Sequence, residues 1–190
     1  MLEIRIHGRG GQGAVLASRI LAWAFFRQGK FVQSFPFFGV ERRGAPVFAC
    51  TRVSDAPIRE RCLIREPTVI LVLDPHLSLE ESVFTGLKEG GTAVMNLHGE
   101  DALSRLPALN GRWKVFAVDG SGIALSHGLG TATSPIVNTV MVGAFGKATG
   151  LLSVEDLTFG IEKVLGKKSE RDIAGMEKAY RKVERLEVKR

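Results

Sequence analysis

The order of apolar and polar residues along the chain predicts strands that alternate with helices. Residues 2–6 (LEIRI) predict a short strand, and residues 14–27 (AVLASRILAWAFFR) predict a helix that Gly29 suits as an end. A second strand is expected at 30–35. The continuous apolar run at 68–74 (TVILVLD) is typical of a strand in a parallel sheet that is covered on both faces.

Further strands and turns follow the same pattern. Residues 47–55 alternate and end in a turn at Asp55-Ala56-Pro57, so a short strand near 58–63 would complete a hairpin. A helix is expected near Ser78, because Glu81 stands three residues on and gives the spacing of a capping box. Two more strands are expected, at 92–97 and 113–119.

The C-terminal part of the chain predicts three helices. A long helix is expected from Ser134, because serine is a good N-cap and Pro135 suits the first helical position. Two more are expected from Ser153 and Ser169, each of which has an aspartate three residues later. In the last helix one apolar stripe is formed by Ile173, Met176, Tyr180, Val183 and Leu186.

Together these elements predict an α/β fold with a mostly parallel sheet, at least one antiparallel element and a C-terminal helical segment. The chain has 190 residues, a length that suits one domain. No internal repeat, low-complexity segment or domain boundary interrupts the pattern. We therefore expect a single domain over residues 1–190.

Charge and cysteine content narrow the function classes. Ten Lys and Arg against six Asp and Glu lie in residues 162–190, so +4 of the net charge of +6 is there. Their mixed signs and a single tyrosine suit a solvated helix face better than a nucleic-acid-binding one. The two cysteines, Cys50 and Cys62, have no iron–sulfur or zinc spacing. No signal peptide or long apolar run is evident, so we expect a cytoplasmic protein that binds no metal, nucleic acid or membrane.

The stretch HGRGGQG follows the first expected strand and carries the most distinctive chemistry. Gly8, Gly10 and Gly13 match the G-x-G-x-x-G pattern between a strand and a helix. A dinucleotide site of this type also needs an acid at the end of the second strand. That strand ends at 33–35 without one, and Glu41 lies well beyond it, so a bound NAD or FAD is not expected.

Three interpretations of this loop remain. A tight turn that lets the helix pack closely on the sheet would explain the glycines. Free N–H groups at the helix N-terminus, together with Arg9, would suit a phosphate. A backbone with few side chains would also suit packing against a partner protein.

A second distinctive stretch, FFGVERRGAP, contains Glu41, Arg42 and Arg43 between two glycines. Paired arginines suit phosphate or carboxylate groups. Aromatic residues beside arginine are typical of protein interfaces. A solvated loop would explain the charges but not Phe37 and Phe38.

No residue is a convincing nucleophile or general base. His7 is interpreted as a hydrogen-bonded loop residue. Asp74 ends a buried strand, where α/β proteins place ligands, but it precedes a proline and could simply shape the turn. Asn138 and Thr139, at a helix start, could hydrogen-bond a partner or pack within the fold.

Two of these stretches together resemble a known family. IRIHGRGGQG at 4–13 and FPFFGVERRGAPV at 35–47 are similar to the gamma subunit, or the corresponding domain, of the 2-oxoacid:ferredoxin oxidoreductases, the pyruvate synthase group. IVNTVMVGA at 136–144 resembles that family's third motif. Because two motifs stand at the right separation, the match is more specific than either motif alone.

The resemblance implies a three-layer α/β/α fold and a heteromeric enzyme. That enzyme oxidatively decarboxylates a 2-oxoacid, joins the acyl group to coenzyme A and reduces ferredoxin. Thiamine diphosphate and the iron–sulfur clusters are implied in partner subunits, the thiamine diphosphate-binding and ferredoxin-like ones, and none in this chain. Pyruvate is the expected substrate, although other 2-oxoacid enzymes share these motifs.

Two roles remain open for such a chain: closing over the path of coenzyme A, or holding the other subunits together. The candidate residues for either role are Gly8, Arg9, Gly10, Gly11, Gln12, Gly13, Glu41, Arg42, Arg43, Asn138 and Thr139. No catalytic residue and no metal ligand is expected among them. The alternative function is a stand-alone nucleotide- or phosphate-binding α/β protein that uses the Gly8–Gly13 loop.

Overall fold

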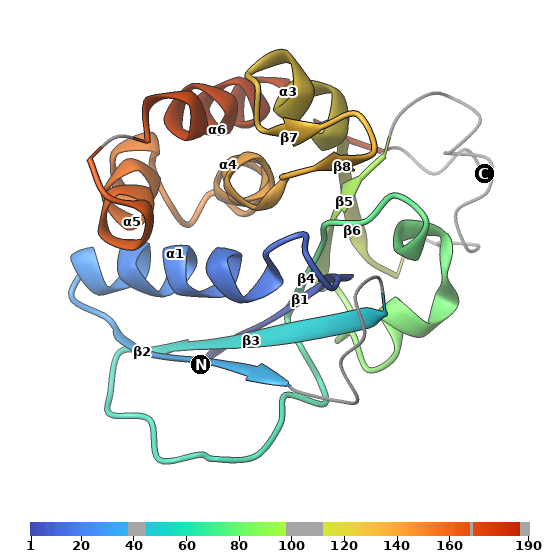
Figure 1. Cartoon of the computed structure of the whole chain (residues 1–190). Coiled ribbons are helices and arrows are strands. Elements are labelled where there is room, and N and C mark those ends of the chain that lie inside the picture. The colour runs from blue at the N-terminus through green and yellow to red at the C-terminus, as the bar shows by residue number, and fades with distance from the viewer. Residues whose placement is uncertain (38–44, 98–111, 168, 187–190) are drawn as a thin grey trace.

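The computed structural model describes residues 1–37, 45–97, 112–167 and 169–186. Its main feature is a seven-stranded mixed sheet in the order β2-β3-β1-β4-β5-β6-β9 (Figure 1). The four central strands are parallel: β1 (Leu2–Arg9), β4 (Val69–Val72), β5 (Thr92–Asn96) and β6 (Lys114–Val118). β4 is buried along its whole length, as its continuous apolar run predicted.

The flanking strands are antiparallel. β3 (Pro46–Ser54) pairs with β1 on one side and with β2 (Phe31–Phe37) on the other, so β2 forms one edge of the sheet. The prediction of a hairpin between 47–55 and 58–63 was therefore wrong, because β3 turns back on β2 and residues 58–63 form no strand. The opposite edge is the short β9 (Glu184–Arg185), which pairs with β6.

Most helices lie on one side of the sheet (Figure 1). α1 (Ala14–Arg27) and α4 (Asn138–Thr149) share a large core with the sheet, and α5 (Val154–Leu165) and α6 (Glu170–Lys182) pack around them. Residues 138–146 of α4 are all buried, as expected for a helix that is enclosed by others. The α/β fold with a mixed sheet and a C-terminal helical segment is thus confirmed.

The opposite face of the sheet has a smaller core. Two short 3-10 helices, η1 (Leu77–Leu79) and η2 (Glu81–Phe84), cover part of it. They stand where a helix was expected near Ser78. The buried guanidinium of Arg5 accounts for the difference, because its Nη2 donates to the carbonyl oxygens of Val83 and Thr85, which a continuing helix would have used.

Several helix boundaries also differ from the sequence predictions. Ser134 and Pro135 form the strand β8 (Ser134–Pro135), which pairs with β7 (Gly130–Thr131), and α4 begins only at Asn138. A helix that was not predicted, α3 (Gly120–Ser126), follows β6, and Asp119 caps it by accepting from the backbone N–H of Gly122. The segment is rich in glycine and serine, so it lacks the apolar periodicity from which a helix would have been predicted.

The last two helices begin near the predicted residues. Ser153 and Asp156 form the complete capping box of α5. The hydroxyl of Ser169 donates back to Gly166 O instead of capping α6. The predicted stripe continues past the end of that helix, so that Leu186 packs against the smaller core while Met176 lies in the larger one.

Glycines allow two pairs of helices to pack with their backbones in contact. A Cβ at Gly143 of α4 would collide with the carbonyl oxygen of Met176 in α6, and one at Gly160 of α5 would collide with that of Ile20 in α1. Neither carbonyl can move without its helix. Glycine is thus required by close approach at these two positions.

Gly143→Ala should therefore destabilise the fold, by about 1–3 kcal/mol, as overpacking of a rigid contact does. The measurement is the free energy of unfolding in urea. The matched control is Gly175→Ala in the same helix pair, where the added Cβ would meet side chains and no backbone, the nearest being two methyl groups at 3.2 and 3.3 Å. Equal losses in the two variants would contradict the backbone-contact explanation.

Candidate functional site

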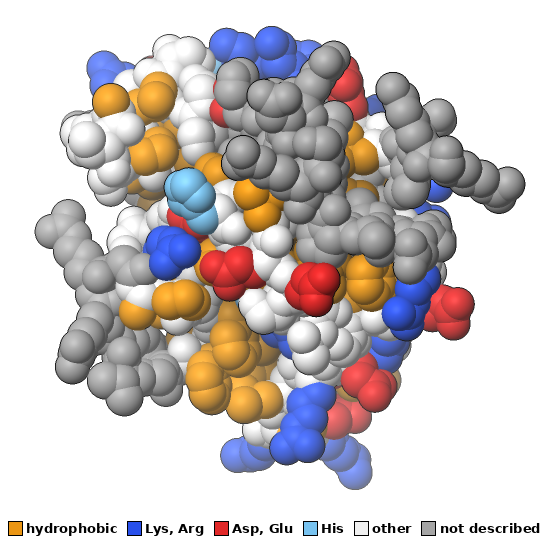
Figure 2. Space-filling view, turned by 90° about the vertical axis from the view of Figure 1, so that its right-hand side faces the viewer, with side chains coloured by type: hydrophobic (Ala, Val, Ile, Leu, Met, Phe, Trp, Pro, Cys, Tyr) orange, Lys and Arg blue, Asp and Glu red, His pale blue; other side chains and the backbone are white. Residues whose placement is uncertain are grey.

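The candidate site lies at the edge of the sheet where the parallel strands end. The chain leaves β1 for α1 on the larger core's face and leaves β4 for η1 on the opposite face. Such a reversal between neighbouring parallel strands opens a crevice in which α/β proteins bind ligands. Figure 2 shows this side of the molecule, where acidic, basic and histidine side chains gather beside hydrophobic ones.

The glycine loop bridges this edge from β1 to α1. β1 runs to Arg9, so Gly8 belongs to the strand and the loop proper begins at Gly10. The backbone N–H of Gly10 donates to Ala45 O at 3.0 Å, which ties the loop to the start of β3. Gly11 and Gly13 have φ angles of 101° and 82°, and residues with a side chain rarely adopt this conformation.

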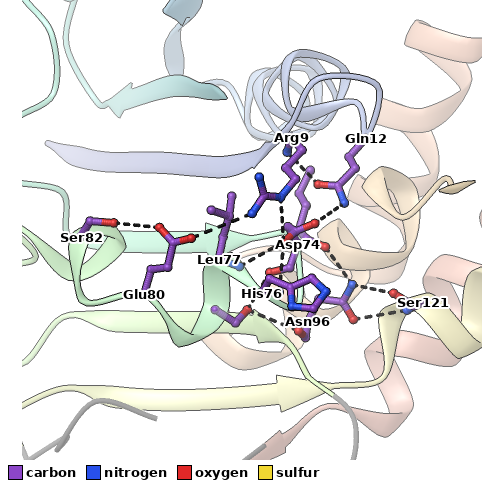
Figure 3. A network of polar contacts seen from close by, with 11 residues as sticks. Arg9, Gln12, Asp74, His76, Leu77, Glu80, Ser82, Asn96 and Ser121 are labelled. Atoms are coloured by element: carbon purple, nitrogen blue, oxygen red, sulfur yellow. Dashed lines mark hydrogen bonds and ion pairs between the residues drawn. The ribbon is translucent and has the colours of Figure 1, made fainter. Parts of the chain in front are cut away.

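Gln12 joins this loop to the end of β4 (Figure 3). Its Oε1 accepts from the backbone N–H of Arg9 at 2.8 Å, and its Nε2 donates to Asp74 Oδ2 at 2.8 Å. Asp74 Oδ1 accepts from the backbone N–H groups of His76 and Leu77, both at 3.0 Å. Asp74 is 5% exposed and both of its carboxylate oxygens are engaged, so it organises two loops and shapes the turn at Pro75.

Arg9 adds charge to the same network. Its Nε lies 3.4 Å from Asp74 Oδ1, and its Nη2 lies 3.9 Å from Glu80 Oε1. The side chain of Arg9 is one-third exposed and that of Glu80 about half exposed. The guanidinium thus lies between two carboxylates (Figure 3), while part of it remains open to solvent.

The network continues to the ends of β5 and β6 through Asn96, which sequence reasoning missed. Its Nδ2 donates to Leu73 O at 2.8 Å and to Ser121 Oγ at 3.0 Å, and its Oδ1 accepts from Gly120 N at 2.9 Å. The signal was a polar residue at the end of the apolar strand run TAVMN. Asn96 thereby fixes the start of α3 relative to β4.

Asn138 and Thr139 lie at the N-terminus of α4 and point in different directions. Asn138 packs against Gly13, where an added Cβ would collide with Nδ2 of the asparagine. Thr139 Oγ1 donates to Asp172 Oδ1 at 2.9 Å and so holds α4 to α6. The structure therefore brings Asn138 to the glycine loop but uses Thr139 inside the helical layer.

Glu41, Arg42 and Arg43 lie outside the described residues. The described residues on both sides of this segment lie beside the site. Phe37 stacks on Phe48 with ring centroids 4.6 Å apart, and Ala45 accepts the hydrogen bond from Gly10. The segment therefore leaves and rejoins the sheet next to the glycine loop.

His7 was predicted to lie in a loop, but it lies inside β1. Its Nε2 accepts from Arg5 Nε at 2.8 Å, and its ring lies 6.0 Å from that of Phe48. Burial, together with the neighbouring Arg5 guanidinium, lowers the pKa of His7 to about 3. The imidazole is therefore neutral at physiological pH and serves as an acceptor for the arginine that holds η2.

The chain's own side chains lie close against two glycines of the G-x-G-x-x-G pattern. A Cβ at Gly8 would come within 3.3 Å of Gln12 Oε1, and one at Gly13 would meet Asn138. Two of the three glycines of the G-x-G-x-x-G pattern are thus explained by contacts within the fold. α1, by contrast, has no side-chain cap and no acid in its first turn, so its N-terminal N–H groups keep their partial positive charge.

The described residues provide no metal-binding cluster. The described residues contain no cluster of three or more His, Cys, Asp or Glu that could hold a metal ion. Cys50 is buried and Cys62 exposed, and neither forms a disulfide. Within the same residues no helix is both long and apolar enough to cross a membrane.

Comparison with known proteins gives the family. The model for the family described as pyruvate ferredoxin/flavodoxin oxidoreductase matches residues 3–182. The chain belongs to this family. It is a gamma-type subunit of a multi-subunit pyruvate/2-oxoacid ferredoxin oxidoreductase, as its relatives are.

Individual relatives of the gamma subunit cover nearly the whole chain. It is 47% identical to pyruvate synthase subunit PorC of Methanothermobacter thermautotrophicus, over 99% of each chain. It is 49% identical to the pyruvate/ketoisovalerate oxidoreductases common subunit gamma of Thermococcus kodakarensis, over 96% of this chain and 97% of that one. The crystal structure of the pyruvate oxidoreductase subunit PORC of Thermotoga maritima shares the fold, with a TM-score of 0.80, 33% identity and 98% of both chains covered.

The Gln12–Asp74 contact can be tested by exchanging its two polar groups. Asp74→Asn places an amide NH2 opposite that of Gln12 and should cost about 1–3 kcal/mol of folding stability. Adding Gln12→Glu restores a donor facing a carboxylate with the same shape, so the double variant should recover part of the loss. Urea unfolding of the single and double variants measures this. Equal losses in both would contradict a direct contact.

The half-buried His7 should make the stability depend on pH. The pKa of histidine is about 6.5 in an unfolded chain, whereas that of folded His7 is about 3. Its contribution is therefore complete above pH 6.5 and is lost as the pH falls toward 3, by at most about 1.4 kcal/mol per pH unit. His7→Gln, which keeps an acceptor for Arg5, should flatten the fall in unfolding free energy between pH 6.5 and 4.5. Identical slopes would show that His7 does not carry this dependence.

Proposed function

We propose that this gamma subunit serves an enzyme that oxidatively decarboxylates pyruvate, transfers the acetyl group to coenzyme A and reduces ferredoxin. Its own part is to help assemble the thiamine diphosphate-binding and ferredoxin-like subunits and to shape the access of coenzyme A. No nucleic acid or membrane takes part, and a cytoplasmic location belongs to the same proposal. The supporting observation is the convergence of the glycine loop, Arg9 and both ends of the arginine-bearing segment at one edge of the sheet.

The redox cofactors of such an enzyme do not fit this chain. A cubane or two-iron cluster needs four thiolates or a mixed set of Cys and His. The chain has two cysteines, of which Cys50 is buried in β3. The proposal therefore leaves thiamine diphosphate and the clusters to other subunits and derives no electron transfer through this one.

Access of coenzyme A is supported by charge at the site. That cofactor carries phosphates, which bind to helix N-termini and to paired arginines. The uncapped end of α1, the one-third-exposed Arg9 and the pair Arg42-Arg43 would supply such groups. A 2-oxoglutarate:ferredoxin oxidoreductase from Magnetococcus marinus has a structure with coenzyme A bound, but at 22% identity it supports the fold alone.

The choice of 2-oxoacid is expected to lie outside this chain. The Thermococcus kodakarensis relative is named as a subunit common to pyruvate and ketoisovalerate oxidoreductases. A subunit shared by two enzymes does not distinguish their substrates. Pyruvate remains our proposal because the FGVERRGAP stretch resembles that group most.

A stand-alone dinucleotide-binding protein is disfavoured by the contacts of Gln12 and by the strand order. Gln12 binds the Arg9 N–H and Asp74, so the loop's long polar side chain is engaged by the chain's own groups. β2 is also separated from β1 by β3, so its end is not adjacent to the loop as a ribose-binding acid requires.

The proposal is tested with the double variant Arg42→Ala/Arg43→Ala in the assembled enzyme. The KM for coenzyme A should rise by about 10-fold or more, the effect of losing hydrogen bonds between charged groups, while the KM for pyruvate is unchanged. Arg171→Ala, an exposed arginine on α6, is the matched control. An unaltered KM for coenzyme A with weakened assembly would refute the access role and leave the architectural one.

A further inference from the structure

The outer surface of α1 and the edge strand β2 enclose an open apolar groove. Its volume is about 320 Å³, and it lies beside the β2 edge of the sheet, opposite the β9 edge. It is lined by Val15, Arg19, Ala22, Trp23 and Phe26 of α1 and by Val32, Ser34 and Pro36 of β2.

The helix presents large apolar side chains there that the fold itself does not cover. Phe26 is 56% exposed and Trp23 38%, and their rings meet edge to face with centroids 5.5 Å apart. The inward face of the same helix packs in the larger core, where Ile20 and Leu21 are completely buried. Contiguous exposed aromatic residues of this kind mark an interaction surface more often than a solvated one.

The strand adds an open row of backbone hydrogen-bonding groups. The carbonyls of Glu3 and His7 in β1 face β4, so the residues between them face β3. In antiparallel pairs successive residues point their backbone groups to opposite sides, and this alternation can be followed through β3 to β2. By this register the backbone groups of Val32, Ser34 and Pro36 point to the free edge of the sheet. Proline fits this position because it lacks an N–H group. Among the described residues no strand pairs with this edge.

Two cations stand at the groove without a carboxylate partner in the described chain. Arg19 is exposed within the groove and forms no ion pair there. Lys163 of α5 lies over the Trp23 ring at 5.8 Å and also has no ion pair among these residues. The groove thus combines an apolar floor with a positively charged rim.

We infer that this groove receives an extended apolar segment, bearing carboxylates, from a different subunit of the same oxidoreductase. The segment would add a strand to β2, bury Trp23 and Phe26, and place acids against Arg19 and Lys163. The inference rests on the proposed assembly role, because the family places the chain in a multi-subunit enzyme.

The rim charge disfavours a second copy of this chain as the occupant. Two copies that paired through β2 would meet about a two-fold axis, so each groove would face an identical one. Arg19 and Lys163 of both copies would then approach each other, and no acid is among the described residues that line the groove. An acidic partner of different sequence avoids this repulsion.

The test uses the full chain co-expressed with the other subunits of its oxidoreductase. Phe26→Ser and Arg19→Glu should each weaken association by about 10- to 30-fold, as central interface residues do. Size-exclusion chromatography of the complex and titration of the purified chain measure this, and circular dichroism checks that each variant is folded. The matched controls are Leu125→Ser on α3, an exposed apolar residue at 41%, and Arg171→Glu on α6. Unchanged affinity for the groove variants overturns the inference.

Two further outcomes separate the alternatives. Val32→Pro removes a backbone donor at the open edge only, and it should weaken association as well; if it does not, the occupant is not an added strand. If the wild-type chain forms dimers alone that Arg19→Glu strengthens, a second copy is the occupant and the inference is wrong. Failure of the wild-type chain to join the complex would refute the proposed function itself, whereas groove variants that assemble normally would refute only the groove.

Discussion

The hydrogen bond between Gln12 and Asp74 is the constraint on which the candidate site depends. It spans 2.8 Å between groups that are 62 positions apart and joins the loop after β1 to the loop after β4. These two loops leave the sheet on opposite faces, and this hydrogen bond joins them together with the ion pair between Arg9 and Asp74. The Gln12 amide also accepts from Arg9 N–H, so it fixes the glycine loop from within.

This arrangement explains the glycines without a bound nucleotide. Gly13 is favoured by its positive φ and by Asn138 of α4, which lies against it, and Gly8 by the close contact of Gln12, which folds back over the strand. The same sequence pattern serves a phosphate in dinucleotide-binding folds and the chain's own side chains here. The pattern therefore reports a close approach to the backbone and not the identity of what approaches.

The sequence predicted those parts of the fold that depend on local signals. The buried strand β4, the helix α1 and the capping box of α5 all have their determinants within a few residues. Of the parts that failed, α3 and the β7–β8 pair have local determinants that apolar periodicity does not report, whereas others depend on distant partners. The 3-10 helices beside Ser78 arise because Arg5 takes the carbonyls of Val83 and Thr85, some 80 positions away.

The candidate site shows the same division. Gln12 and Asn138 were named for their motifs, and Asp74 for its place at the end of a strand, but their contacts with one another follow only from strand order. Asn96 was missed, although the carboxyl ends of neighbouring parallel strands meet at one edge and a polar residue there is a candidate for contact. The Glu41–Arg43 prediction remains a prediction, since those residues lie outside the described chain.

α1 connects the two surfaces for which we propose roles. Its N-terminus starts at Gly13, within the polar network, and its outer side chains Val15, Trp23 and Phe26 line the groove beside β2. Its inner side cannot yield, because Gly160 of α5 packs directly on the Ile20 carbonyl. Because α1 is packed so closely on that side, any displacement of it would move the helix as a whole. A segment docked in the groove would therefore restrain the glycine loop as well, so that assembly and the geometry of the candidate coenzyme A path would be set by one element.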